Sequence, residues 1–226
     1  MSTVFTGAKF SVQRFVSGFA NNAFLITCAR TNRSVIIDTP GNPDELIGAA
    51  LATNVGAVLI THGHRDHLEG FEAVTGFFDV PVGIGAADRG SLPAPGTAPG
   101  ADSPGPVDLS TGELVEVGDI VLYAMATPGH TPGSTCFLLE GGSPGEVAHV
   151  FTGDTLFPGG PGKSASHAAL EQIIGSLETH IFTLADSTVV LPGHGDFTTI
   201  GESKRGYAVF ASRPLDPALS GDVTWA

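Results

Sequence analysis

The feature that most constrains this chain is a pattern that occurs four times: an apolar run is followed at once by a short polar segment containing His or Asp. Residues 61–67, Thr-His-Gly-His-Arg-Asp-His, follow the apolar run 57–60, and similar segments further along the chain carry His130, Asp154 and His194. A short apolar run bounded by turn residues is typical of a buried strand. We therefore expect four strand ends that carry His or Asp, and a fold that gathers these ends on one rim would bring the side chains together.

The residue types in these segments are ligands of divalent metal ions. Imidazole nitrogens and carboxylate oxygens suit zinc, and also iron or manganese, and no Cys lies among them. The candidates are His62, His64, Asp66, His67, His130, Asp154 and His194. A single loop histidine is more often an ordinary polar residue, but His130 and His194 share a Pro-Gly-His context. His149, His167 and His180 lack such a context, and we interpret them as ordinary surface or helix residues.

This set resembles the metallo-β-lactamase-fold hydrolases, whose His-x-His-x-Asp-His signature matches residues 62–67 and whose later ligands match in order. The resemblance implies a four-layer αββα sandwich and two divalent metal ions, most often Zn²⁺. One ion would be held by His62, His64 and His130, the second by Asp66, His67 and His194, with Asp154 bridging the two. The resemblance also implies that Asp38, at the end of an early strand, fixes a ligand imidazole.

Residues 152–157 and 192–202 resemble the glyoxalase II-like group, whose members hydrolyse thioesters. This implies that Asp66 orients the attacking water and shuttles its proton. Residues 158–164 depart from the stretch common in that group, and only about thirty residues follow His194. We therefore expect no counterpart of the group's helical glutathione-binding domain, so the resemblance does not extend to glutathione specificity. Lys163 follows a Gly-rich turn and is a candidate contact for a substrate carboxylate; a solvated lysine is the alternative.

Two other activities remain open. The persulfide dioxygenases are similar to this group and use one iron, which here would be held by His62, His130 and Asp154. A lactonase or β-lactam hydrolase is the other alternative, although a carboxylate at residue 154 in place of Cys is unlike the commoner β-lactamases. A non-enzymatic binding protein of this fold would usually have lost ligands. Every ligand position is filled here, which favours an enzyme.

Composition and charge limit the kinds of molecule that this protein can bind. The 226 residues, 42% of them hydrophobic, predict one globular domain spanning residues 1–226. Ten Lys and Arg face 23 Asp and Glu, which gives a net charge of −13. This balance excludes a nucleic-acid partner and favours a small-molecule substrate. The sequence has no apolar stretch near the roughly 20 residues that span a bilayer and no basic start typical of a signal peptide, so we expect no membrane partner and a cytoplasmic protein.

The order of expected elements predicts the α/β class, with strands followed by a helix in each half. Strands are expected around residues 9–15, 23–28, 34–38, 57–60, 107–126, 134–139 and 147–151. Helices are expected from Asp44 to Leu51, from Asp66 through Val74, and over 167–185. Residues 92–106 are rich in Pro and Gly and predict a surface loop that either overhangs the site or merely connects the halves. Cys28 and Cys136 lie in apolar runs and are expected to be buried free thiols.

Overall fold

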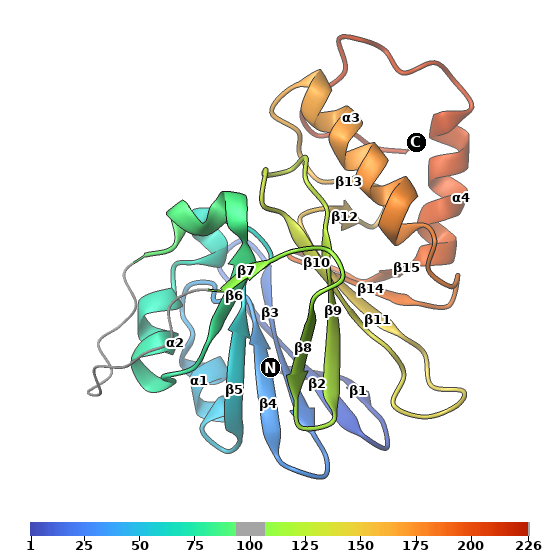
Figure 1. Cartoon of the computed structure of the whole chain (residues 1–226). Helices are drawn as coiled ribbons and strands as arrows, with labels where there is room; N and C mark the ends of the chain where they lie inside the picture. Colours follow the sequence, from blue (N-terminus) through green and yellow to red (C-terminus); the bar gives the residue numbers. More distant parts are fainter. Residues whose placement is uncertain (94–106, 226) are drawn as a thin grey trace.

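Two sheets packed face to face form the centre of the protein, with helices on their outer faces (Figure 1). The computed structural model describes residues 1–93 and 107–225. In the first sheet the strands run in the order of the sequence: β1 (Ser2–Thr6), β2 (Phe10–Ser17), β3 (Asn21–Cys28), β4 (Arg33–Ile37), β5 (Asn54–Leu59), β6 (Val82–Gly85) and β7 (Val107–Leu109).

The strands of the second sheet do not follow the order of the sequence. Their spatial order is β15 (Thr198–Thr199), β14 (Val189–Pro192), β11 (His149–Gly153), β10 (Thr135–Leu139), β9 (Ile120–Ala126) and β8 (Leu114–Val117). A small separate hairpin is formed by β12 (Leu156–Phe157) and β13 (Gly160–Pro161).

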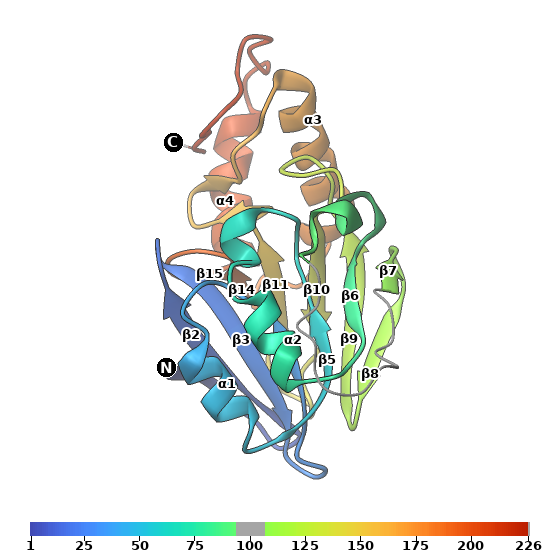
Figure 2. The same ribbon diagram turned by 90° about the vertical axis from the view of Figure 1, so that its left-hand side faces the viewer.

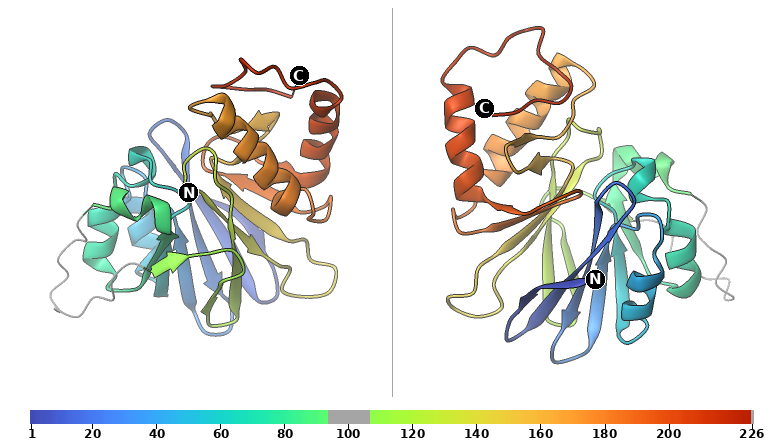
Figure 3. Two further views of the ribbon diagram at one scale, coloured as in Figure 1. Left: turned by 45° about the horizontal axis from the view of Figure 1, so that its top comes forward. Right: turned by 180° about the vertical axis from the view of Figure 1, so that it is seen from behind.

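The helices form the outer layers. The α-helices are α1 (Asp44–Ala50), α2 (Phe71–Phe77), α3 (His167–Ser176) and α4 (Ile200–Ala211). The 3₁₀-helices η1 (Arg65–His67) and η2 (Ala86–Ser91) and the π-helix η3 (Leu177–Ile181) complete the set. Figure 2 shows α1 and α2 on the outer face of the first sheet, and the views in Figure 3 show α3 and α4 beside the second sheet.

Three hydrophobic clusters hold these layers together. The largest lies between the sheets and includes Phe24 from the first sheet and Phe151 from the second. The second cluster joins the first sheet to α1 and α2, and the third joins the second sheet to α3 and α4. Strand β3 is covered on both faces, and all but one of its residues are buried, as expected for a strand inside a sandwich. The predicted α/β class and four-layer sandwich are confirmed.

Strand directions bring the candidate residues to one end of the sandwich. Strands β4, β5 and β6 are mutually parallel, and β11 is parallel to β14. The carboxyl ends of parallel strands meet at the same edge of a sheet, where ligands usually bind in open α/β sheets. Asp38, His62, Asp154 and His194 follow β4, β5, β11 and β14, respectively.

The prediction that a helix begins at Asp66 was wrong. Residues 65–67 form a 3₁₀ turn, and α2 begins only at Phe71. The amide of Gly70 donates to the carbonyl of Thr39 at 2.8 Å instead of to Asp66 in the previous turn, which interrupts an α-helix at this point. Leu68, Phe71 and Val74 are nevertheless buried against the first sheet, as their spacing predicted.

The helix expected over 167–185 is shorter than predicted. Helix α3 ends at Ser176 and passes into η3, where the amide of Phe182 donates to the carbonyl of Leu177. This bond spans five residues and widens the turn into a π-helix. Strand β1, at the edge of the first sheet, was not expected. Of the predicted loop 92–106, residues 94–106 lie outside the described part of the chain.

Cys28 and Cys136 are buried free thiols, as expected. Across residues 1–93 and 107–225, no helix combines the length and apolar character needed to cross a membrane.

Candidate metal centre

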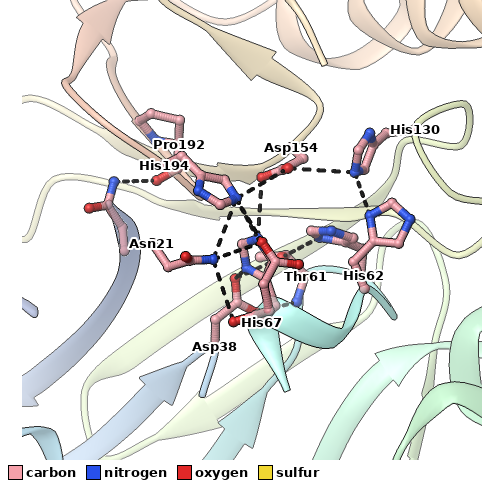
Figure 4. Close-up of polar contacts among 12 residues, drawn as sticks. Asn21, Asp38, Thr61, His62, His67, His130, Asp154, Pro192 and His194 are labelled. Carbon is pink, nitrogen blue, oxygen red and sulfur yellow. Dashed lines mark hydrogen bonds and ion pairs between the residues drawn. The ribbon is translucent and has the colours of Figure 1, made fainter. Parts of the chain in front are cut away.

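The structure brings all seven candidate residues together at one end of the sandwich. Figure 4 labels five of them, His62, His67, His130, Asp154 and His194. Three overlapping groups have ligand atoms that lie within 4.8 Å of one another. The groups are His62, His64 and His130; His62, His67 and Asp154; and Asp66, His67 and His194. The first and third coincide with the two ligand sets expected from the sequence. The second group places Asp154 between them, so the gathering is as predicted, while the role of these residues as metal ligands stays a prediction.

The donor atoms face one another across short gaps. His130 Nε2 lies 2.9 Å from His64 Nδ1, and His67 Nε2 lies 3.1 Å from His194 Nε2. Asp154 Oδ2 lies 3.5 Å from both His130 Nε2 and His194 Nε2, and its Oδ1 lies 3.4 Å from His67 Nε2. Asp154 therefore contacts both sets, which is the position that a bridging carboxylate needs.

Backbone carbonyls fix the tautomer of two rings. His130 Nδ1 donates to the carbonyl of Lys163 at 2.8 Å, and His194 Nδ1 donates to the carbonyl of Phe19 at 3.2 Å. A carbonyl oxygen only accepts, so in both neutral rings the proton lies on Nδ1 and the Nε2 lone pair points into the site. This is the usual arrangement of an imidazole that binds a metal through Nε2.

Asp38 orients two further imidazoles. Its Oδ2 accepts from His67 Nδ1 at 3.0 Å and from the Thr61 hydroxyl at 2.8 Å, and its Oδ1 accepts from the Thr61 amide at 2.8 Å. Because the Thr61 hydroxyl donates to Asp38, it accepts from His62 Nδ1, 3.1 Å away. His62 Nε2 is then a buried lone pair with no hydrogen-bond partner. Such an orphaned acceptor among converging N and O donors fits a bound divalent cation.

Charges in the site are strongly coupled. Burial, together with the neighbouring imidazoles, holds the pKa of His62 well below its ordinary value, which keeps this ring neutral. Burial also lowers the pKa of His67, but the Asp38 and Asp154 carboxylates outweigh it and raise that pKa to about 10. Burial raises the pKa of Asp154, but the neighbouring His67 outweighs it and the net shift is downward. Without a cation, the His67 proton therefore balances part of the negative charge.

Asn21 lies in the site but was not predicted from the sequence. Asn21, at the start of β3, donates from Nδ2 to Asp66 Oδ2 at 2.9 Å and lies 3.5 Å from His194 Nε2. Burial raises the pKa of Asp66, but this hydrogen bond helps to lower it overall. Asn21 precedes an apolar strand rather than following one. The pattern of His or Asp after an apolar run therefore does not include it. Strand β3 runs antiparallel to β4 and so begins at the end of the sandwich where β4 stops.

The other candidates lie as follows. The Lys163 side chain is mostly exposed and pairs with Asp222 at 3.9 Å, while its carbonyl holds His130. Its role in substrate binding stays a prediction. The surface or helix position predicted for His149 was wrong: this residue is buried in β11 opposite Leu139. His167 begins α3 and His180 lies in η3, as predicted. Neither His149 nor His167 is among the three candidate metal groups.

Comparison with known proteins agrees with this geometry. The family profile described as "Metallo-beta-lactamase superfamily" matches residues 16–194. The chain is 32% identical to the hydroxyacylglutathione hydrolase GloC of Haemophilus influenzae, over 84% of this chain and 92% of that protein. The crystal structure of ETHE1 from Myxococcus xanthus is similar with a TM-score of 0.67 and 29% identity, covering 86% of this chain and 81% of that one.

A second solved structure bears on the metals. TTHA1623, crystallised in a di-iron-bound form, is similar with a TM-score of 0.68 and 26% identity, covering 85% of this chain and 97% of that one. The fold implies divalent metal ions, and the gathered His and Asp residues supply candidate ligands for them. With the profile matching most of the chain and the site assembled at the expected end of the sandwich, the chain belongs to the metallo-beta-lactamase superfamily.

Proposed function

We propose that this protein is a metal-dependent hydrolase with a dinuclear centre that cleaves a thioester. The observation that carries the proposal is the pair of complete donor sets joined by Asp154. His62, His64 and His130 would hold one ion, and Asp66, His67 and His194 the second. The similarity to GloC over 92% of its length supports a thioester as the substrate class.

When bound, two divalent ions supply Lewis acidity, which activates water as a nucleophile and polarises a carbonyl oxygen. The chain's own residues do the rest. Asp66 is partly exposed, and Asn21 holds its Oδ2 at 2.9 Å. Its lowered pKa keeps this carboxylate ionised at neutral pH, so it can accept a hydrogen bond from the attacking water and take its proton. Asp38 and Thr61 fix His67 and His62, which keeps the donor atoms in place during the reaction.

The test combines metal content with two assays. Elemental analysis of protein purified without added metal should give two metal ions per chain, and the same preparation should hydrolyse S-lactoylglutathione or a simpler thioester. His64→Ala should lower kcat/KM by about 100-fold or more, because it removes one donor of the first set. His180→Ala, which changes a histidine of η3 outside the gathered set, should leave activity and metal content unchanged. Two bound metals without cleavage of any thioester would contradict the proposed substrate class.

A second candidate is a persulfide dioxygenase with one iron held by His62, His130 and Asp154. The specific observations in its favour are the similarity to ETHE1 and the 3.5 Å separation of His130 Nε2 and Asp154 Oδ2. Oxygen consumption with glutathione persulfide, one iron per chain and no thioester cleavage would establish this activity instead. Lactones and β-lactams in the same assays test the remaining alternative.

A further inference from the structure

A buried carboxylate is hydrogen-bonded to both loops that carry His62, His64 and His130, which we call the three-histidine set. Asp88 belongs to η2, just after β6, and is only 5% exposed. It accepts three hydrogen bonds, all from outside its own helix. Gly63 N donates to Oδ2 at 2.7 Å, Thr131 Oγ1 donates to Oδ2 at 2.6 Å, and Gly133 N donates to Oδ1 at 2.9 Å. The carboxylate is therefore well supplied with partners, each of them uncharged.

The three donors belong to two loops that carry candidate ligands. Gly63 stands between His62 and His64, so fixing its amide fixes the backbone on which both rings are mounted. Thr131 and Gly133 follow His130 in the second loop. The rings of His64 and His130 meet across these loops at 2.9 Å. A single side chain thus bonds to both loops beside the place where their imidazoles approach each other.

The backbone around Asp88 is packed too closely for larger residues at the neighbouring glycines. A Cβ on Gly133 would lie 2.6 Å from Asp88 N, and a Cβ on Gly85 would lie 2.0 Å from the Gly133 carbonyl. Glycine at these positions lets the backbone of η2 approach the His130 loop directly. Asparagine at position 88 would fill the same space, but its amide group would direct N–H towards donors that need an acceptor.

We propose that Asp88 is a positioning residue for the three-histidine metal site, setting the separation of His62 and His64 from His130. This rests on the proposed metal-dependent function. The other set is supported from elsewhere: Asp66 by Asn21, and His67 by Asp38. Loss of the Asp88 carboxylate therefore weakens metal binding at the first set and leaves the second set unchanged.

The experiment separates the two sets before testing Asp88. The first background, Asp66→Ala/His194→Ala, keeps the three-histidine set. The second background, His64→Ala/His130→Ala, keeps the set of Asp66, His67 and His194. Zn²⁺ affinity is measured in each background by competition with a chromophoric chelator, with and without Asp88→Asn. The expected result is about 10- to 100-fold weaker binding in the first background and an unchanged affinity in the second. Equal weakening in both backgrounds, or none in the first, would overturn the proposal.

Three further variants guard against a folding defect and supply a control. If circular dichroism shows that Asp88→Asn does not fold, Thr131→Val removes one of the three donors, whereas Thr131→Ser keeps it. Zn²⁺ binding in the first background should be weaker with Val than with Ser, and equal affinities would overturn the proposal. Glu116→Gln changes an exposed carboxylate of β8, in the other sheet, and should have no effect.

These affinities are independent of the substrate. Failure to cleave thioesters would overturn the proposed function without touching the role of Asp88. By contrast, suppose that the protein has no hydrolase activity but binds Zn²⁺ in the first background. Loss of that binding on Asp88→Asn would still support the positioning role. Absence of any Zn²⁺ binding before Asp88 is changed would overturn both.

Discussion

At the scale of single residues, one carboxylate organises two imidazoles. Asp38 bonds directly to His67 and reaches His62 through the Thr61 hydroxyl. Its backbone has a φ of +59°, in the left-handed region, where Asp is tolerated better than most residues. The position therefore combines a side chain that the site needs with a backbone conformation that few other side chains adopt easily.

The raised pKa of His67 predicts how the metal-free protein responds to pH. This pKa is about 10 in the folded protein and near 6.5 in the unfolded chain. Between pH 7 and 9, the folded protein keeps a proton that unfolding releases. The extra stability is fully present below pH 6.5 and falls as pH rises towards 10, by up to about 1.4 kcal/mol per pH unit. Urea denaturation of the metal-free protein at pH 7, 8 and 9 measures this slope.

Asp38→Asn supplies the comparison, since it removes one of the two carboxylate charges that raise this pKa. The stability of that variant should depend less steeply on pH over the same interval. A wild-type protein whose unfolding free energy is the same at pH 7 and pH 9 would contradict the prediction.

At the scale of elements, a hairpin supports the loop of His194. Asn22, in β3, is fully buried and donates from Nδ2 to the carbonyls of Pro192 and Gly195 at 2.9 and 3.0 Å. Its Oδ1 accepts from Arg14 Nε at 2.7 Å, and Arg14 also donates to the Gly195 carbonyl at 2.6 Å. The first sheet thereby holds a loop that emerges from the second.

Asn22→Ala should destabilise this connection. The change removes the side-chain donor of the buried Pro192 carbonyl and the acceptor of Arg14 Nε, while the Gly195 carbonyl keeps its bond from Arg14. We expect it to lower the free energy of unfolding by about 1 to 3 kcal/mol. Equilibrium denaturation in urea measures the difference. Asn54→Ala, at the exposed start of β5, is the matched control and should change stability by less than about 0.5 kcal/mol. Similar decreases in the free energy of unfolding for the two variants would show that the hydrogen bonds of Asn22 do not stabilise the protein.

Elements also show what the sequence could predict. Strands β5, β9, β11 and β14 were predictable because apolar runs end abruptly at turn residues, and the ligand candidates come directly after them. The interruption before α2 was not predictable, because it depends on the Gly70 amide finding Thr39 on another segment. Asn21 and Asp88 were missed for the same reason: their partners are distant in sequence, and no local pattern marks them.

At the scale of the whole molecule, the two sheets meet through a shared apolar layer. Phe24 and Phe151 come from opposite sheets, and their rings pack edge to face with centroids 5.0 Å apart. Since the ligand candidates come from loops of both sheets, this layer sets the distance between the two halves of the site. Packing in the middle of the sandwich and geometry at its end are therefore linked.

Two phenylalanines provide a test of this layer. Phe151 is fully buried between the sheets, whereas Phe19, in the β2–β3 turn, is 92% exposed. Phe151→Ala should lower the free energy of unfolding by about 3 to 5 kcal/mol because it leaves a cavity. Phe19→Ala should change it by no more than about 0.5 kcal/mol. Thermal and urea denaturation of both variants check the contrast, and a small effect at Phe151 would mean that the sheets can close over the missing ring.

The wide separation of the ligand candidates along the chain has a consequence for folding kinetics. His62 follows a strand of the first sheet and His194 follows a strand of the second. Contacts between residues so distant in sequence form slowly, so we expect these two to come together only after both sheets have formed and docked. The complete site is therefore absent from early folding species. A bound cation would then slow unfolding strongly and leave the rate of folding almost unchanged, because interactions missing from the transition state act on the unfolding step alone.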